Sequence, residues 1–288
     1  MHASHLLDPN KPSSTKGRRT TPYFNLGSAA QLYYEDHGTG QPIIFIHGVW
    51  MSSRFFEPQY TALSDRFRVI ALDLRGHGRS THTPAGHTVP TYAQDLRAFI
   101  QGLALGDVIL AGWSMGAFVI WDYVKQFGTA GIKGTIVIDE SASDFKWPDW
   151  SYGSADMPTL IHIFATVQTA RPDFVNALIG LMFKDAPDAT AHRWMFDEIT
   201  RLPESIATAI LFDQTLQDYR PVLAQVDVPT LLCFGRDEKL IPVAAGEHLA
   251  QELPQARLVV FEQSSHCPFL EEPAHFNREV AAFVQGLG

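Results

Sequence analysis

The feature that most constrains the fold is a short apolar run that leads into a serine between two glycines. Residues 108–111 (VILA) have the composition of a buried strand, and residues 112–116 (GWSMG) follow at once. The apolar spacing after them predicts a helix that ends near Phe127. A G-x-S-x-G sequence between a strand and a helix forms a sharp turn that exposes the serine hydroxyl. The stretch therefore predicts a nucleophilic Ser114 at the end of a buried strand.

The rest of the chain alternates buried-strand patterns with helical ones. This alternation is typical of βαβ units, which form a mostly parallel sheet with helices on both faces. Ligands of such sheets bind beyond the carboxyl ends of the strands, where Ser114 also falls. The expected strands are residues 23–26, 31–36, 43–46, 68–72, 108–111, 135–138, 229–234 and 257–262. The expected helices are residues 54–63, 91–105, 115–127, 243–253 and 273–284.

The alternation stops in the middle of the chain. No strand pattern occurs in residues 144–219, which predicts a helical cap inserted into an α/β core of residues 22–143 and 220–288. Residues 1–21 are polar and lack the apolar segment of a secretory signal, so they are expected to form a disordered tail. The cap helices are expected to begin near Pro158, Pro172, Pro187 and Pro203.

The composition argues against several classes of function. The formal net charge of −9 argues against a surface for nucleic acid or for anionic membranes. No apolar run approaches the ~20 residues of a bilayer span. Two cysteines are too few for a disulfide framework, and neither a dinucleotide nor a metal-binding motif occurs. We therefore expect a cytoplasmic protein without cofactor or metal, whose partner is a small molecule. The sequence leaves the oligomeric state open.

A serine nucleophile needs a base, and the base needs an acid that orients it. In folds with this turn, the acid and then a histidine follow the serine along the chain. His266 comes shortly after the last expected strand, where a loop can place it over Ser114. The loop after the preceding strand offers two adjacent acids, Asp237 and Glu238. His266 is therefore the expected base, with one of the two acids as its partner.

The negative charge that develops when a serine attacks a carbonyl needs backbone N–H donors. One donor is expected from Met115, the residue after the serine. The second is expected from the loop that holds Val49 or, alternatively, from Trp50 in the same loop. Cys267 is adjacent to His266 and suggests a thiol nucleophile as an alternative. That alternative is the weaker one, because adjacent residues rarely point at each other.

Several segments resemble one known family. Together they are similar to the α/β-hydrolase superfamily, and closest to its cofactor-free haloperoxidase, aryl esterase and lactonase group. The resemblance extends from about Tyr23 to the C-terminus, although the cap is similar only in type. The segments are HGVWMSSRFFEPQ (47–59), RVIALDLRGHGRS (68–80), TYAQDL (91–96), AGWSMG (111–116) and SSHCPFLEEP (264–273).

The resemblance implies an eight-stranded sheet with the cap after the sixth strand. Members of the family commonly place the acid three residues after a glycine and four before a proline, which favours Glu238 over Asp237. The implied activity is that of a serine hydrolase that cleaves carboxylic esters or lactones through an acyl-enzyme. Related dehalogenases and epoxide hydrolases carry Asp at the position of Ser114, so the resemblance excludes their chemistry.

Other functions remain as alternatives. Trp50 replaces a proline that is common in haloperoxidase-like members, which counts against perhydrolase activity. Carbon–carbon bond hydrolases usually have a Ser/Gly-rich loop where residues 49–51 stand. A non-catalytic receptor on the same fold keeps the triad, so the sequence does not exclude it. The side chains expected to contact substrate are Trp50, Trp113, Met157 and Phe164.

Overall fold

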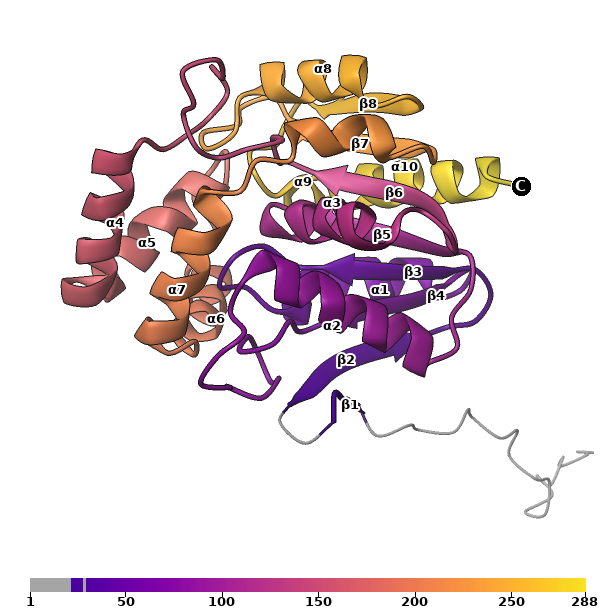
Figure 1. Cartoon of the computed structure of the whole chain (residues 1–288), viewed down its shortest axis with the longest axis horizontal. Helices are drawn as coiled ribbons and strands as arrows, with labels where there is room; N and C mark the ends of the chain where they lie inside the picture. Colours follow the sequence, from indigo (N-terminus) through magenta and orange to yellow (C-terminus); the bar gives the residue numbers. More distant parts are fainter. Residues whose placement is uncertain (1–21, 28–29) are drawn as a thin grey trace, which may run out of the picture.

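One eight-stranded sheet organises the protein (Figure 1). The computed structural model describes residues 22–27 and 30–288. The strand order is β1-β2-β4-β3-β5-β6-β7-β8; the pairs that involve β2 are antiparallel and the others are parallel. The predicted eight-stranded, mostly parallel sheet is therefore confirmed. The strands are β1 (Tyr23–Asn25), β2 (Gln31–His37), β3 (Pro42–Ile46), β4 (Arg68–Leu72), β5 (Val108–Trp113), β6 (Ile132–Ile138), β7 (Thr230–Gly235) and β8 (Ala256–Phe261).

Helices cover both faces of this sheet. On one face α1 (Glu57–Leu63) packs against α10 (Pro273–Gly286), and on the other α2 (Val89–Gly102) packs against α3 (Met115–Phe127). Helix α8 (Val243–Glu252) contacts β7 and β8. Every residue of β5 and β7 is buried, which explains why these strands read as continuous apolar runs rather than as alternating patterns.

The helix expected over residues 54–63 is divided. A 3₁₀ turn, η1 (Ser53–Phe56), precedes α1, which begins at Glu57. Pro58 is the reason, because it has no N–H to donate one turn back and is tolerated only in the first turn of a helix. Two further short helices were not expected from the sequence: η2 (Arg220–Gln225) and α9 (Pro268–Glu271).

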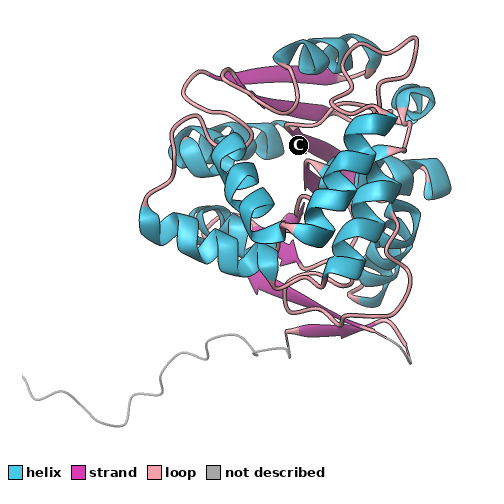
Figure 2. Ribbon diagram, turned by 90° about the vertical axis from the view of Figure 1, so that its left-hand side faces the viewer, coloured by secondary structure: helices cyan, strands magenta, loops and turns pink. Residues whose placement is uncertain are grey.

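A helical cap follows β6 and lies over the end of the sheet toward which the arrows of β3 and β6 point (Figures 1 and 2). The predicted helical insertion after the sixth strand is confirmed. Its helices begin close to the expected prolines, because proline is tolerated in the first turn of a helix. At the start of α6, the side chain of Asp188 accepts the N–H of Ala191 at 2.8 Å and caps the helix. They are α4 (Met157–Thr169), α5 (Arg171–Met182), α6 (Ala189–Thr200) and α7 (Glu204–Thr215).

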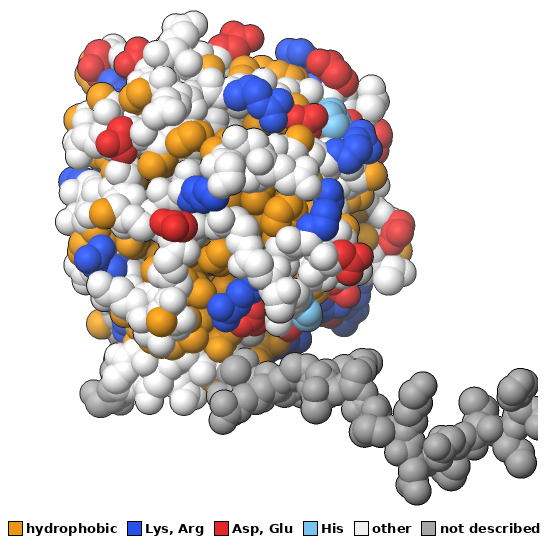
Figure 3. Space-filling model, turned by 90° about the vertical axis from the view of Figure 1, so that its right-hand side faces the viewer, with side chains coloured by type: hydrophobic (Ala, Val, Ile, Leu, Met, Phe, Trp, Pro, Cys, Tyr) orange, Lys and Arg blue, Asp and Glu red, His pale blue; other side chains and the backbone are white. Residues whose placement is uncertain are grey.

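The face opposite the cap carries basic and acidic side chains interspersed with scattered apolar ones (Figure 3). Among residues 22–27 and 30–288, no helix has both the length and the apolar character needed to cross a bilayer. The disordered tail predicted for residues 1–21 lies outside the described residues.

Candidate active site

The turn after β5 holds Ser114 in a strained backbone conformation. Its φ of 52° and ψ of −127° are angles that residues with a side chain rarely adopt. A Cβ on Gly112 would lie 2.4 Å from the backbone of Gly116, and a Cβ on Gly116 would lie 2.2 Å from the carbonyl oxygen of Ile46. The Ser114 N–H donates to the carbonyl of Ile138 at 2.9 Å. Close packing of strand and helix therefore requires both glycines and fixes the serine at the end of the sheet.

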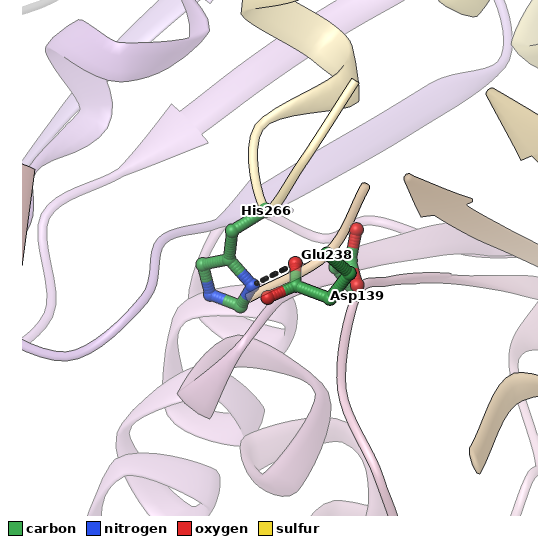
Figure 4. A group of neighbouring side chains, drawn as sticks. All are labelled: Asp139, Glu238 and His266. Atoms are coloured by element: carbon green, nitrogen blue, oxygen red, sulfur yellow. Dashed lines mark hydrogen bonds and ion pairs between the residues drawn. The ribbon is translucent and has the colours of Figure 1, made fainter. Parts of the chain in front are cut away.

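His266 and Glu238 form a buried hydrogen-bonded pair (Figure 4). Nδ1 of His266 lies 3.0 Å from Oε2 of Glu238. The other carboxylate oxygen, Oε1, accepts the backbone N–H of Ile241 at 3.0 Å and that of Leu240. Burial raises the pKa of Glu238, but the His266 charge and these hydrogen bonds outweigh it and hold the pKa below its usual value. An ionised Glu238 keeps the proton on Nδ1 of His266 and leaves Nε2 able to accept a proton.

The loop after β8 carries His266 into the same cavity as Ser114. Trp113 holds this loop, because its indole N–H donates to the carbonyl of His266 at 2.9 Å. The Ser265 N–H donates to the carboxylate of Glu271 at 2.8 Å. Among the residues described, no hydrogen bond joins the Ser114 hydroxyl to His266; in unliganded sites such bonds often tighten only when substrate binds.

Two alternatives from the sequence lose support. The carboxylate of Asp237 pairs with Nζ of Lys184 at 2.7 Å, and its side chain is 44% exposed, so the geometry favours Glu238 as the acid. Cys267 is buried, and burial raises the pKa of its thiol well above the usual value. A thiolate is the reactive form of cysteine, so Cys267 is a poor nucleophile here.

A buried histidine positions the loop after β3. Nε2 of His47 accepts the N–H of Leu74 at 3.0 Å, and Nδ1 donates to the carbonyl of Gly48 at 2.7 Å. Burial lowers the pKa of His47 to about 4, so the ring is neutral at neutral pH. Both nitrogens are used within the protein, which makes His47 a support for the loop and not a base.

The expected backbone donors lie on two segments beside Ser114. Met115 is the first residue of α3, so its N–H has no acceptor within the helix. Val49 and Trp50 both line the cavity. Trp50 has a φ of 68°, and its indole N–H donates to the carbonyl of Ala207 on α7 at 2.9 Å. This bond ties the loop to the cap, and the loop donors remain a prediction.

The cavity that Ser114 and His266 share lies between the sheet and the cap and has a volume of about 260 Å³. Its walls are mostly apolar, which suits the carbon chain of a small organic molecule. The cap contributes side chains from α4, α5 and α7, and the core contributes the loops after β3 and β7. The apolar lining residues include Val49, Trp50, Ile163, Phe174, Leu178, Leu181, Leu211, Leu240 and Ile241.

Comparison with known proteins agrees with this arrangement. Residues 43–279 match the sequence model of the alpha/beta hydrolase family. The chain belongs to this family. It is 32% identical over 267 residues to the AB hydrolase superfamily protein YisY of Bacillus subtilis (strain 168), covering 91% of this chain and 98% of that protein. It is 28% identical over 274 residues to a non-heme haloperoxidase of Rhodococcus erythropolis, covering 92% and 99%. The solved structure of an esterase, RhEst1, from Rhodococcus sp. ECU1013 matches with a TM-score of 0.79 and 26% identity, covering 90% and 96%.

The residues that line the cavity of this α/β hydrolase differ in part from the substrate contacts expected from the sequence. Of the four side chains expected, Trp50 alone lines the cavity. Trp113 is 1% exposed and holds the His266 loop from behind. Met157 and Phe164 are 40% and 41% exposed and do not line the cavity. Helix α4 turns Ile163 toward the cavity, so the helical period directs the other two outward. Trp113, Met157 and Phe164 therefore do not line the cavity that Ser114 shares with His266.

A further acid, which no sequence motif indicated, lies beside Glu238 and His266 in this hydrolase. Asp139 follows β6 with a φ of 48° and is fully buried. One carboxylate oxygen accepts the N–H of Gly235 at 2.9 Å, and ligand atoms of Asp139, Glu238 and His266 all lie within 4.8 Å of one another (Figure 4). Burial, and then the Glu238 charge, raise the pKa of Asp139 well above its usual range. Because Glu238 and Nδ1 of His266 already bond each other, the cluster fits a protonated Asp139 beside this pair better than a metal site.

Proposed function

We propose that this α/β hydrolase is a serine hydrolase that cleaves carboxylic esters or lactones through an acyl-enzyme. The observation that carries the proposal is the buried Glu238–His266 pair in a cavity that Ser114 also lines. A hydroxyl becomes an effective nucleophile at neutral pH when an oriented base can take its proton. The mostly apolar cavity leaves room for a small neutral substrate.

The residues divide the reaction between them. Oγ of Ser114 attacks the carbonyl carbon, and its proton passes to Nε2 of His266. The ionised Glu238 stabilises the imidazolium through the bond to Nδ1. His266 then returns the proton to the leaving alcohol, which leaves the acyl group on Ser114. A water molecule, deprotonated by His266, releases the acid and restores the serine.

Two backbone groups would stabilise the oxyanion in this mechanism. The N–H of Met115 stands at the start of α3, and the N–H of Val49 belongs to the loop that His47 supports. Each such donor typically lowers the barrier by ~3 kcal/mol. Because both donors are backbone groups, the fold and not a side chain must place them.

The relatives support two related reactions. One relative is an esterase, and another relative is a non-heme haloperoxidase. An acyl-enzyme attacked by hydrogen peroxide instead of water yields a peracid, so perhydrolysis is the second candidate. Peracid formation from acetate and hydrogen peroxide, compared with hydrolysis of p-nitrophenyl acetate, distinguishes the two. We expect hydrolysis to dominate, and a peracid rate above the hydrolysis rate would reverse the order.

The test of the main proposal is direct. A fluorophosphonate probe should label Ser114, and Ser114→Ala should abolish both labelling and the hydrolysis of short-chain p-nitrophenyl esters. Ser64→Ala, at the end of α1, serves as the control and should keep full activity. Thermal unfolding shows whether each variant is folded. Unchanged turnover in a folded Ser114→Ala variant would refute the assignment.

A further inference from the structure

We propose that Glu140, Asp144 and Gln214 form a polar subsite in the substrate cavity that binds an O–H or N–H donor on the substrate. The inference rests on the proposed function and narrows it to esters or lactones that carry a hydroxyl, amide or ammonium group away from the scissile bond. The mechanism uses none of these three residues, and no sequence motif singled them out.

The three side chains come from two parts of the fold and meet at one wall of the cavity. Glu140 and Asp144 lie in the segment after β6, and Gln214 lies on α7 of the cap. All three line the cavity shared with Ser114 and His266. They are 1%, 6% and 5% exposed, respectively. Nε2 of Gln214 donates to Oδ2 of Asp144 at 3.0 Å, which joins the cap to the core at this point.

One oxygen of each side chain is buried without a hydrogen-bond partner in the described structure. These atoms are Oε2 of Glu140, Oδ1 of Asp144 and Oε1 of Gln214. A buried polar atom without a partner typically costs about 1–3 kcal/mol, so three in one cavity wall need an explanation. All three are oxygens, and the group that completes them must therefore donate a hydrogen.

A proton shared between Glu140 and Asp144 supplies one of the missing hydrogen bonds. Burial, and then the Asp144 charge, raise the pKa of Glu140 well above its usual value. Burial also raises the pKa of Asp144, although bonds from Gln214 and Glu140 and the charge of His266 oppose the rise. Glu140 therefore keeps the proton and donates a hydrogen bond to Asp144, which keeps its negative charge. The carboxylate of Asp144 and the amide oxygen of Gln214 remain as acceptors for a ligand.

The apolar walls of the cavity should increase the preference for substrates with a hydrogen-bond donor over purely alkyl ones. Apolar residues such as Ile163, Leu178 and Leu211 form its other cap-side walls. A substrate with only alkyl groups fills this space but leaves the acceptors of Asp144 and Gln214 unpaired. Sites that are built to bond a polar group discriminate strongly against analogues that lack it, because their own buried groups then stay unsatisfied.

The experiment compares p-nitrophenyl esters in pairs of equal length. The pairs are 6-hydroxyhexanoate against heptanoate, 6-ammoniohexanoate against heptanoate, and N-acetyl-β-alaninate against 5-oxohexanoate. We expect kcat/KM for at least one donor-bearing ester to exceed that of its partner by about tenfold or more. A ratio below about tenfold in every pair would overturn the inference.

Substitutions assign the preference to the three residues. Asp144→Asn and Gln214→Leu should each bring the ratio near unity, whereas Glu140→Gln should keep it because the amide can donate to Asp144 as the protonated acid does. Asp213→Asn is the matched control: Asp213 precedes Gln214 but accepts the N–H of Val89 at 2.8 Å and does not line the cavity. If Asp144→Asn does not fold, Gln214→Leu decides. A preference that survives both substitutions would overturn the inference.

The same panel separates the two proposals. Hydrolysis of the heptanoate ester that depends on Ser114, without any donor preference, would refute the subsite alone. Heptanoate hydrolysis that continues in Ser114→Ala would refute the serine hydrolase itself.

Discussion

The two sides of the cavity that Ser114 and His266 line are built from different kinds of structure. On the core side, Ser114, Glu238 and His266 follow β5, β7 and β8, and the hydrogen-bonded register of neighbouring strands fixes where those strands end. On the cap side, the lining residues project from α4, α5 and α7, which the chain connects to the sheet only through loops. Helices of the cap contact each other, and α7 also contacts α2.

This difference suggests that the core side supports the reaction and that the cap side selects the substrate. Proton transfer needs groups held within a fraction of an ångström, and a hydrogen-bonded sheet supplies that rigidity. Shape and polarity for a substrate can be supplied by helices whose side chains vary without disturbing the sheet. We therefore expect core-side substitutions to change the rate and cap-side substitutions to change the choice of substrate.

The largest effect should come from the base. His266→Ala should lower kcat for p-nitrophenyl butyrate by about 10⁴-fold, because the serine then has no acceptor for its proton. Phe174→Ala, on the cap wall of the cavity, should raise KM more than it lowers kcat. Steady-state kinetics measure both. Equal losses of kcat in the two variants would contradict the division between core and cap.

A second test concerns the acid beside the triad. Glu238→Ala should lower kcat by about 10²- to 10³-fold, less than His266→Ala, because Asp139 can ionise once the Glu238 charge is gone. Asp139→Asn alone should cost only a few fold. The double variant should lose about tenfold more than the two single losses predict. A double-mutant cycle on kcat checks this, and additive losses would show that Asp139 does not stand in for Glu238.

Within the cap, one helix provides a matched pair of positions. Leu160 is 1% exposed on α4, whereas Met157 on the same helix is 40% exposed. Leu160→Ala should lower the free energy of unfolding by about 3 kcal/mol, because it leaves a cavity in the packed side of the helix. Met157→Ala should change it by less than about 0.5 kcal/mol. Urea unfolding measures both; similar losses would mean that the outward face of α4 is also packed.

The smallest expected effect is a pH dependence of stability. Burial lowers the pKa of His47 to about 4, below the value of about 6.5 expected in the unfolded chain. The unfolded chain therefore binds a proton first as pH falls, so the stability from neutral His47 is present above pH ~6.5 and is lost toward pH ~4. Between pH 7 and pH 5 the native protein should lose about 2 kcal/mol relative to His47→Gln. Parallel pH slopes in urea unfolding of the two proteins would rule this out.

Local signals in the chain were enough to predict the sheet, and they also singled out the groups that the proposed reaction would use. The glycines around Ser114 mark the turn because only they allow the helix and the neighbouring strand to approach so closely. His266 and the adjacent acids Asp237 and Glu238 could be proposed because parallel strands all end at the same edge, so the loops after them converge. The family resemblance then favoured Glu238 over Asp237. The prolines of the cap marked its helix starts for an equally local reason.

Which cap side chains face the substrate depended on packing. Helix α4 carries apolar residues on several sides, so its period did not show that Ile163 faces the cavity while Met157 and Phe164 face outward. The polar wall of Glu140, Asp144 and Gln214 was equally hidden, because the acids lie in an irregular segment and the amide lies on α7, about 70 residues further along the chain. Contacts between distant segments leave no local periodicity, and only the folded chain brings such groups together.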